Sequence, residues 1–126
     1  METATVAVLV LSMVASWYGP GFDGQTAASG EVYDQNALTA AHRTLPFDTL
    51  LLLEHGGNRV TVRINDRGPY CVEAVAAGRL APHPERELDL SREAFSQLAP
   101  LSAGVIQLQV RFLRYGEALL PRRLKR

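Results

Sequence analysis

The chain has 126 residues, 47% of them hydrophobic and 21% charged, and its 13 basic and 13 acidic residues give a formal net charge of zero. This length and composition predict a single folded domain, and the balanced charge argues against a nucleic-acid partner. A lone cysteine, Cys71, excludes an internal disulfide, and no pair of histidines has the spacing of a zinc site.

The N-terminal segment is open to two interpretations. Ala4 to Ala15 is an apolar run that is too short for an integral membrane span. It resembles the core of an export signal, but Glu2 precedes it and no lysine or arginine does. The run also continues without a break into a strand-like stretch that ends at Gly19. Residues 1–14 are therefore expected to be either the remnant of a signal or part of a first strand.

Further along the chain, alternating or apolar runs bounded by turn residues predict short strands. Together with the first strand, the predicted strands lie at residues 10–18, 37–41, 49–54, 59–65, 87–90 and 104–113. The nearly all-leucine run at 49–54 suggests a strand buried on both faces. Residues 19–36 are rich in Gly, Ser, Thr, Asp and Asn and indicate a long ordered loop, a feature that is more often functional than idle.

Two short helices are also expected. One covers residues 71–77 and is ended by Gly78, and the other begins after a Ser91 N-cap and runs through Leu98. Six strands with one or two helices in a small domain favour a closed β-barrel, because closure removes exposed sheet edges. We expect this barrel at residues 15–115 and a basic C-terminal tail at residues 116–126.

Three side chains stand out as candidates for acid–base chemistry. Asp66 lies at the end of the 59–65 strand, where Gly68-Pro69 must stop the sheet ladder. Glu31 lies in the long loop and His42 at another strand end. Two carboxylates and an imidazole in one cleft suit general acid–base work on a sugar or ester bond. The residue types alone leave the alternative open that these side chains cap turns and support loops.

Several motifs together resemble the rare lipoprotein A family. They are Ala15-Ser16-Trp17-Tyr18-Gly19, residues 28–34, residues 36–47, residues 62–69 and Asp89-Leu90-Ser91, in the family's order. The resemblance implies a six-stranded double-psi β-barrel, related to expansins and to the barrel of a membrane-bound lytic transglycosylase. It also implies an endolytic peptidoglycan lytic transglycosylase, which cuts glycan strands lacking stem peptides and leaves 1,6-anhydro ends.

The resemblance also suggests roles for individual residues. Asp66, His42 and Glu31 match the family's functional residues, with Asp66 as the general acid. The residues expected to bind substrate are Arg43, Arg67, Trp17, Tyr18 and Asn65. The arginines are expected to point away from Asp66, toward carboxylates of the glycan. For Trp17 and Tyr18, a core-anchoring role is an equal alternative, and for Asp89 helix capping is favoured over a supporting part in the cleft.

The chain departs from the family pattern at three places, one of which is Asp23-Gly24-Gln25 in place of a more basic version. The connection from Tyr70 to Leu88 is longer than usual and is either a lid over the cleft or a surface insertion. Asp48 stands where the family generally has glycine. Two other functions stay open: a non-catalytic, expansin-like module that binds wall polysaccharide, and a hydrolase that uses Asp66 as its acid.

The same resemblance bears on partners and location. It implies peptidoglycan glycan strands as the partner, no cofactor and no metal. It places the protein in the cell envelope, as a periplasmic or secreted protein. The sequence does not determine the oligomeric state, and a monomer is expected.

Overall fold

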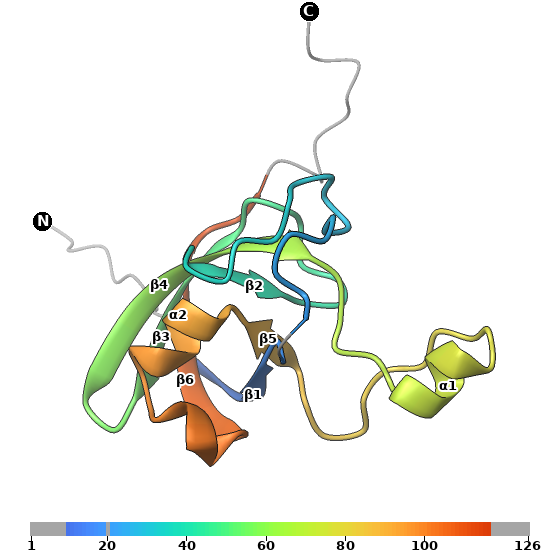
Figure 1. Cartoon of the computed structure of the whole chain (residues 1–126). Coiled ribbons are helices and arrows are strands. Elements are labelled where there is room, and N and C mark those ends of the chain that lie inside the picture. The colour runs from blue at the N-terminus through green and yellow to red at the C-terminus, as the bar shows by residue number, and fades with distance from the viewer. Residues whose placement is uncertain (1–9, 20, 117–126) are drawn as a thin grey trace, which may run out of the picture.

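A computed structural model of the chain describes residues 10–19 and 21–116 and is shown in Figure 1. Its six strands close into a barrel in the order β1-β5-β2-β4-β3-β6, which confirms the predicted barrel. The strands are β1 (Val10–Trp17), β2 (Thr39–Ala41), β3 (Leu50–His55), β4 (Asn58–Asp66), β5 (Leu88–Leu90) and β6 (Ile106–Arg114). Residues 10–14 thus belong to the first strand, whereas residues 1–9 and the tail 117–126 lie outside the described residues.

Two strand pairs in the barrel are parallel, β1 with β5 and β2 with β4, and the others are antiparallel. Their register sets four residues in one row across four strands. Asp66 of β4 pairs with Ala41 of β2, Ala41 pairs with Asp89 of β5, and Asp89 pairs with Ser16 of β1. The barrel thereby brings two carboxylates far apart in sequence to the same level of the sheet.

Alternate residues of the strands point into the barrel and form its core, as period-two patterning requires. The expectation that the leucine run is buried on both faces is wrong for β3. Leu51 and Leu53 are fully buried, but Leu50 and Leu52 are only half-buried. In a small closed barrel one face of each strand points inward and the other outward, unlike a parallel sheet covered by helices on both faces.

The helices differ in their relation to the core. α2 (Arg92–Ser96) begins after Ser91, whose side chain accepts a hydrogen bond from the N–H of Ala94, and it buries Phe95 completely. A 3₁₀ turn, η1 (Leu101–Ala103), follows. α1 (Val72–Ala76) stands apart from the barrel at the right of Figure 1. Among the residues that the structure describes, no helix is long and apolar enough to cross a membrane.

Candidate active site

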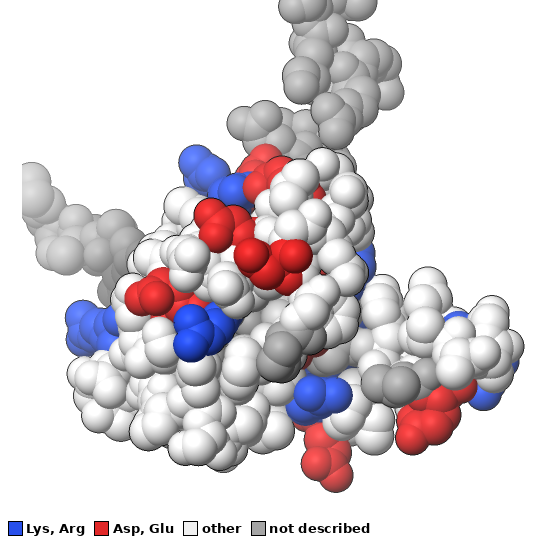
Figure 2. All heavy atoms as spheres, in the orientation of Figure 1, with Lys and Arg blue, Asp and Glu red and all other residues white. Residues whose placement is uncertain are grey.

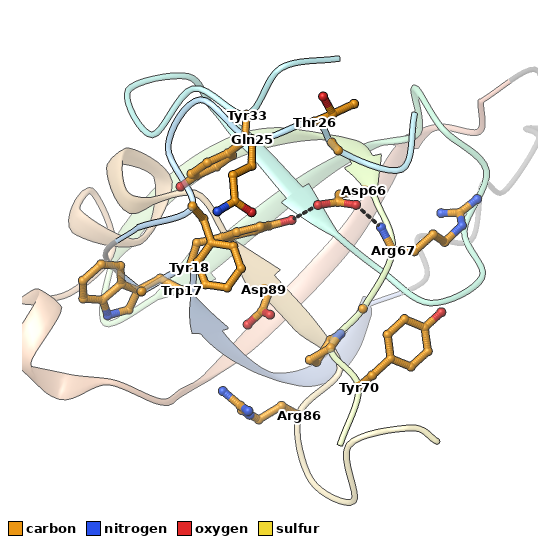
Figure 3. A pocket seen from close by; sticks show the side chains of 15 residues that line it. Trp17, Tyr18, Gln25, Thr26, Tyr33, Asp66, Arg67, Tyr70, Arg86 and Asp89 are labelled. Carbon is orange, nitrogen blue, oxygen red and sulfur yellow. Dashed lines mark hydrogen bonds between the residues drawn. The ribbon is translucent and has the colours of Figure 1, made fainter. Parts of the chain in front are cut away.

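A cavity of about 410 Å³ lies where the row of Asp66 and Asp89 meets the loop 21–36 and the start of the link after β4. Figure 3 shows its side chains, with Gln25, Thr26 and Asp66 on one side and Arg86 and Tyr70 on the other. The lining residues are Trp17, Tyr18, Gly19, Phe22, Gln25, Thr26, Ala27, Tyr33, Asp66, Arg67, Gly68, Pro69, Tyr70, Arg86 and Asp89.

Asp66 is the last residue of β4, and three donors hold its carboxyl group. Oδ2 accepts a hydrogen bond from the Tyr18 hydroxyl at 2.8 Å. Oδ1 accepts one from the N–H of Ala28 and one from the N–H of Arg67, both at 2.8 Å. The chain then turns at Gly68, whose φ of 135° favours glycine, and passes through a cis bond to Pro69. A strand end and a stiff turn thus fix Asp66 at the cavity wall.

Tyr18 is the one side-chain donor to Asp66 among the described residues. Burial, and then the negative charge of Asp66, raise the pKa of the Tyr18 hydroxyl well above its usual value. Tyr18 therefore stays a neutral phenol and keeps a proton to donate. Its ring stacks on Tyr33, with centroids 4.4 Å apart, and meets Phe22 edge-on at 5.7 Å.

Glu31, the second predicted catalytic carboxylate, lies outside the cavity lining. Its two oxygens pair with Arg63, at 2.6 Å to Nη1 and 2.8 Å to Nη2. Its Oε1 also accepts a longer contact of 3.4 Å from Asn65, the neighbour of Asp66. Hydrogen bonding to Arg63 lowers the pKa of Glu31, which keeps it ionised. Glu31 and Asn65 thus contact each other, and neither lines the cavity.

His42 follows β2 directly and also lies outside the cavity lining. Its backbone N–H donates to the carbonyl of Asp66 at 3.2 Å. Its Nδ1 accepts hydrogen bonds from the N–H groups of Thr44 and Leu45, at 3.1 and 3.0 Å. Burial, and then the positive charges of the neighbouring arginines, lower the pKa of His42 to about 4. The imidazole is therefore neutral at pH 7, with its proton on Nε2.

The two arginines expected to bind substrate form no ion pair with Asp66 among the described residues, and both bind backbone carbonyls. Arg67 donates from Nη1 to the carbonyls of His42 and Leu45, and its guanidinium lies 3.9 Å above the ring centre of Phe47. Arg43 donates from Nη1 to the carbonyls of Pro69 and Arg86. Both side chains thus connect loops to one another, and of the two only Arg67 lines the cavity.

Asp89 has a different place from the capping role favoured by the sequence. It lies within β5, and Ser91 is the residue that caps α2, so the capping interpretation is wrong. The Oδ1 of Asp89 accepts a hydrogen bond from the hydroxyl of Ser16, and the Oγ of Ser16 accepts one from Nη1 of Arg86 at 2.9 Å. Asp89 therefore belongs to a polar chain that runs along the cavity wall.

The aromatic side chains combine both expected roles. Trp17 donates from Nε1 to the carbonyl of Leu101 at 3.1 Å and packs near Phe95, yet it also lines the cavity. Tyr33 is buried and forms part of the same wall. Aromatic faces along a polar cavity provide surfaces on which sugar rings can stack.

Five of the nine predicted site residues line the cavity, namely Asp66, Arg67, Trp17, Tyr18 and Asp89; Glu31, His42, Arg43 and Asn65 do not. The sequence reasoning missed Arg86 and Tyr70. Their signal was their position, since they begin and nearly end the long link between two predicted site residues. In the described part of the chain, no group of three or more His, Cys, Asp or Glu side chains is arranged to hold a metal ion.

Known proteins resemble this chain over most of its length. The sequence profile of a family described as "Lytic transglycolase" matches residues 11–110. An endolytic peptidoglycan transglycosylase RlpA from Campylobacter jejuni is 41% identical over 83% of this chain, and a probable one from Treponema pallidum is 44% identical over 87%. These matches cover only 34% and 31% of the two relatives, so the chain spans about a third of their length.

Solved structures give the same fold at low sequence identity. A Streptomyces papain inhibitor matches 84% of this chain and 96% of its own, with a TM-score of 0.62 and 22% identity. An expansin from Clavibacter michiganensis matches 84% of this chain and 51% of its own, with a TM-score of 0.60 and 22% identity. With the family match, these likenesses confirm the predicted double-psi β-barrel.

Proposed function

The chain belongs to the lytic transglycolase family, and we propose that its barrel is an endolytic peptidoglycan lytic transglycosylase that cuts glycan strands lacking stem peptides. The names of its relatives support peptidoglycan as the substrate and transglycosylation as the reaction. The observation that carries the proposal is the place of Asp66, a carboxyl group fixed by three donors at the wall of an aromatic-lined cavity.

The hydrogen bonds around Asp66 suggest which oxygen carries the proton. Oδ1 accepts two backbone N–H groups and has no room for a proton between them, whereas Oδ2 has a hydroxyl partner. A hydroxyl both donates and accepts. Tyr18 can therefore donate to Oδ2 when the carboxyl is ionised and accept from it when Oδ2 is protonated. In our mechanism Oδ2 is the acid and faces the glycosidic oxygen.

The reaction follows with its protons balanced. Oδ2 of Asp66 gives its proton to the oxygen that links N-acetylmuramic acid to N-acetylglucosamine, and the bond from that oxygen to the muramoyl C1 breaks. The carboxylate then accepts the proton of the muramoyl C6 hydroxyl, and O6 forms a new bond to C1. Asp66 is protonated again, no water is consumed, and the product has a 1,6-anhydro end.

Glu31 and His42 support this site from behind in the proposed mechanism. Glu31 contacts Asn65 and so fixes the residue next to Asp66, while His42 holds the turn whose carbonyls bind Arg67. Asp89, Trp17 and Tyr18 complete the cavity wall.

Mass analysis of a digest tests the proposal. Stem-peptide-free glycan strands are incubated with the parent protein, with Asp66→Asn and with Asp34→Asn, an exposed aspartate in the loop 21–36 that does not line the cavity. We expect anhydro products, one water lighter than hydrolysis products, from the parent and from Asp34→Asn. Asp66→Asn should lose at least a hundredfold in rate. An Asp66→Asn protein that digests as fast as the parent refutes Asp66 as the acid.

The same digest separates the two other candidate functions. Products with reducing ends indicate a hydrolase. Strands that bind but stay uncut indicate an expansin-like binding module, for which the aromatic wall formed by Trp17, Tyr18 and Tyr33 is the supporting feature. The expansin likeness itself supports only the fold, because the identity is 22%.

The location follows from the substrate. Peptidoglycan lies in the cell envelope, so we propose that this barrel acts there, in the periplasm or after secretion, with glycan strands as its partner and as a monomer. Figure 2 shows acidic and basic side chains interspersed on one face of the molecule instead of a single basic field.

A further inference from the structure

The long link after β4 contributes to the cavity through its two ends only. Pro69 and Tyr70 at its start and Arg86 near its end line the cavity, whereas α1 in its middle stands away from the barrel (Figure 1). The ends are joined to each other, because the N–H of Cys71 donates to the carbonyl of Ala81 and Tyr70 forms a bridge with Pro82. The link is therefore not a lid, and its contribution to the site is the pair Tyr70 and Arg86.

Arg86 is held in place at its backbone and at its side chain. Its N–H donates to Nδ1 of His83 at 3.0 Å, and its carbonyl accepts a hydrogen bond from Arg43 at 2.9 Å. Its Nη1 donates to Oγ of Ser16, whose own proton is committed to Asp89. One nitrogen of the half-buried Arg86 guanidinium is thus held in place at the cavity edge.

The rest of that guanidinium is available to a ligand. An arginine carries five N–H donors, and only one of those on Arg86 has a hydrogen-bond partner within residues 10–19 and 21–116. In that same part of the chain, no carboxylate forms an ion pair with Arg86 within 4.0 Å. Arg67 differs, because two carbonyls and the Phe47 ring occupy its guanidinium.

The charges around the cavity select where an anionic group can bind. Asp66 lies on the other side of the cavity and repels a ligand carboxylate, whereas Ser16 connects Asp89 to Arg86, so such a group is accommodated by the N–H groups of Arg86 that have no partner (Figure 3). A planar guanidinium with free N–H groups matches a carboxylate with two parallel hydrogen bonds. The uncharged part of a sugar is left for the aromatic wall.

We propose that Arg86 is a specificity-determining residue that binds a free carboxylate of the substrate, and that the long link contributes this arginine to the site. The identity of this carboxylate rests on the proposed function: it is the lactyl group of a muramic acid residue without its stem peptide. A stem peptide converts that carboxylate into a neutral amide, which removes the charge that Arg86 recognises.

The test compares two glycans and four proteins. Stem-peptide-free strands are used as they are, or after carbodiimide coupling to methylamine, which turns each lactyl carboxylate into a neutral amide. The proteins are the parent, Arg86→Gln, Arg86→Lys and Arg79→Gln. Arg79 is the matched control, since it is an exposed arginine of the same link that does not line the cavity. Binding is measured by co-sedimentation with insoluble strands, cleavage by kcat/KM, and folding by urea denaturation.

We expect amidation of the strands to weaken parent binding and kcat/KM by about tenfold, the loss of a charge-assisted hydrogen bond. Arg86→Gln should lose the same factor on acidic strands and nothing more on amidated ones. Arg86→Lys should keep part of the preference, because it retains the charge without the planar fork. Arg79→Gln should behave as the parent does.

Equal losses by Arg86→Gln on both glycans, or no loss on either, overturn the inference, because a purely structural arginine does not respond to the ligand's charge. The proposed function fails separately. Strands that are bound with this charge preference but never cut support the role of Arg86 and refute the transglycosylase. Anhydro products formed without any charge preference support the transglycosylase and refute the role of Arg86.

Discussion

His42 gives the chain a stability that depends on pH. Its neutral ring accepts two backbone hydrogen bonds at Nδ1, and a proton on that atom breaks both. Burial lowers the pKa of His42 most, followed by the charges of Arg43 and Arg67, and the more distant Glu87 opposes this effect only in part. The folded protein therefore resists protonation of His42 until the pH approaches 4.

The sign and size of the effect follow from linkage. An unfolded histidine binds a proton near pH 6.5, while the folded one does so at about pH 4. Between these values the unfolded chain holds more protons, so stability is complete above pH 6.5 and falls as the pH drops toward 4. At 1.36 kcal/mol per pH unit the unscreened loss would be about 3 kcal/mol, and because the ring is partly exposed to solvent we expect about half of that, 1–2 kcal/mol.

The assay is urea denaturation of the parent and of His42→Asn at several pH values from 7.5 to 4. Asparagine is the matched control, because its side-chain oxygen can accept the same backbone N–H groups but does not titrate. The carboxylates of both proteins titrate alike, so they cancel in the difference between the two curves. We expect that difference to change by about 1–2 kcal/mol over the range, which is the linkage effect reduced by solvent screening. A difference that is constant from pH 7 to 4.5 refutes the reasoning.

Two further predictions concern the loops around Asp66. Asp48 has a φ of 69°, a conformation that suits glycine. Asp48→Gly should therefore leave the free energy of unfolding unchanged or raise it by up to about 1 kcal/mol, whereas Asp48→Ala should lower it by about 1–2 kcal/mol. Urea denaturation of both variants checks this, and equal effects of the two substitutions would contradict it. Glu31→Gln should lower stability by less than about 1 kcal/mol, because its pair with Arg63 is well exposed. If Glu31 supports Asp66, cleavage by that variant falls by more than the small unfolded fraction accounts for, and a fully active Glu31→Gln protein removes Glu31 from the site.

Much of the fold could be predicted because its local signals agree with one another. Alternation marked β4 and β6, the pair Gly56-Gly57 marked the hairpin between β3 and β4, and Ser91 marked the start of α2. The half-buried outer face of β3 could not be predicted, because a run of leucines has no period and its exposure depends on which sheet surrounds it.

The candidate site was less predictable, since side-chain partners depend on register. The sequence suggested that Glu31, His42 and Asp66 converge, yet the barrel turns Glu31 toward Arg63 and His42 toward its own turn. The sequence also favoured Asp89 as a helix cap, because nothing in the sequence around Asp89 indicates that β5 pairs with both β1 and β2. Only that pairing sets Asp89 in the same row as Asp66.

The extra length of the link between Pro69 and Asp89 is compatible with a working site for a physical reason. The entropic cost of a loop grows slowly with its length, so a self-contained insertion adds little once its ends are joined. Those ends are joined here by the contact of Cys71 with Ala81, and they are attached to the barrel by the hydrogen bond from Arg43 to Pro69. The middle of the link is then free to vary, while its last residues are held where a side chain reaches the cavity. If Arg86 binds a substrate carboxylate as we propose, an insertion of this kind changes what the site recognises without moving Asp66.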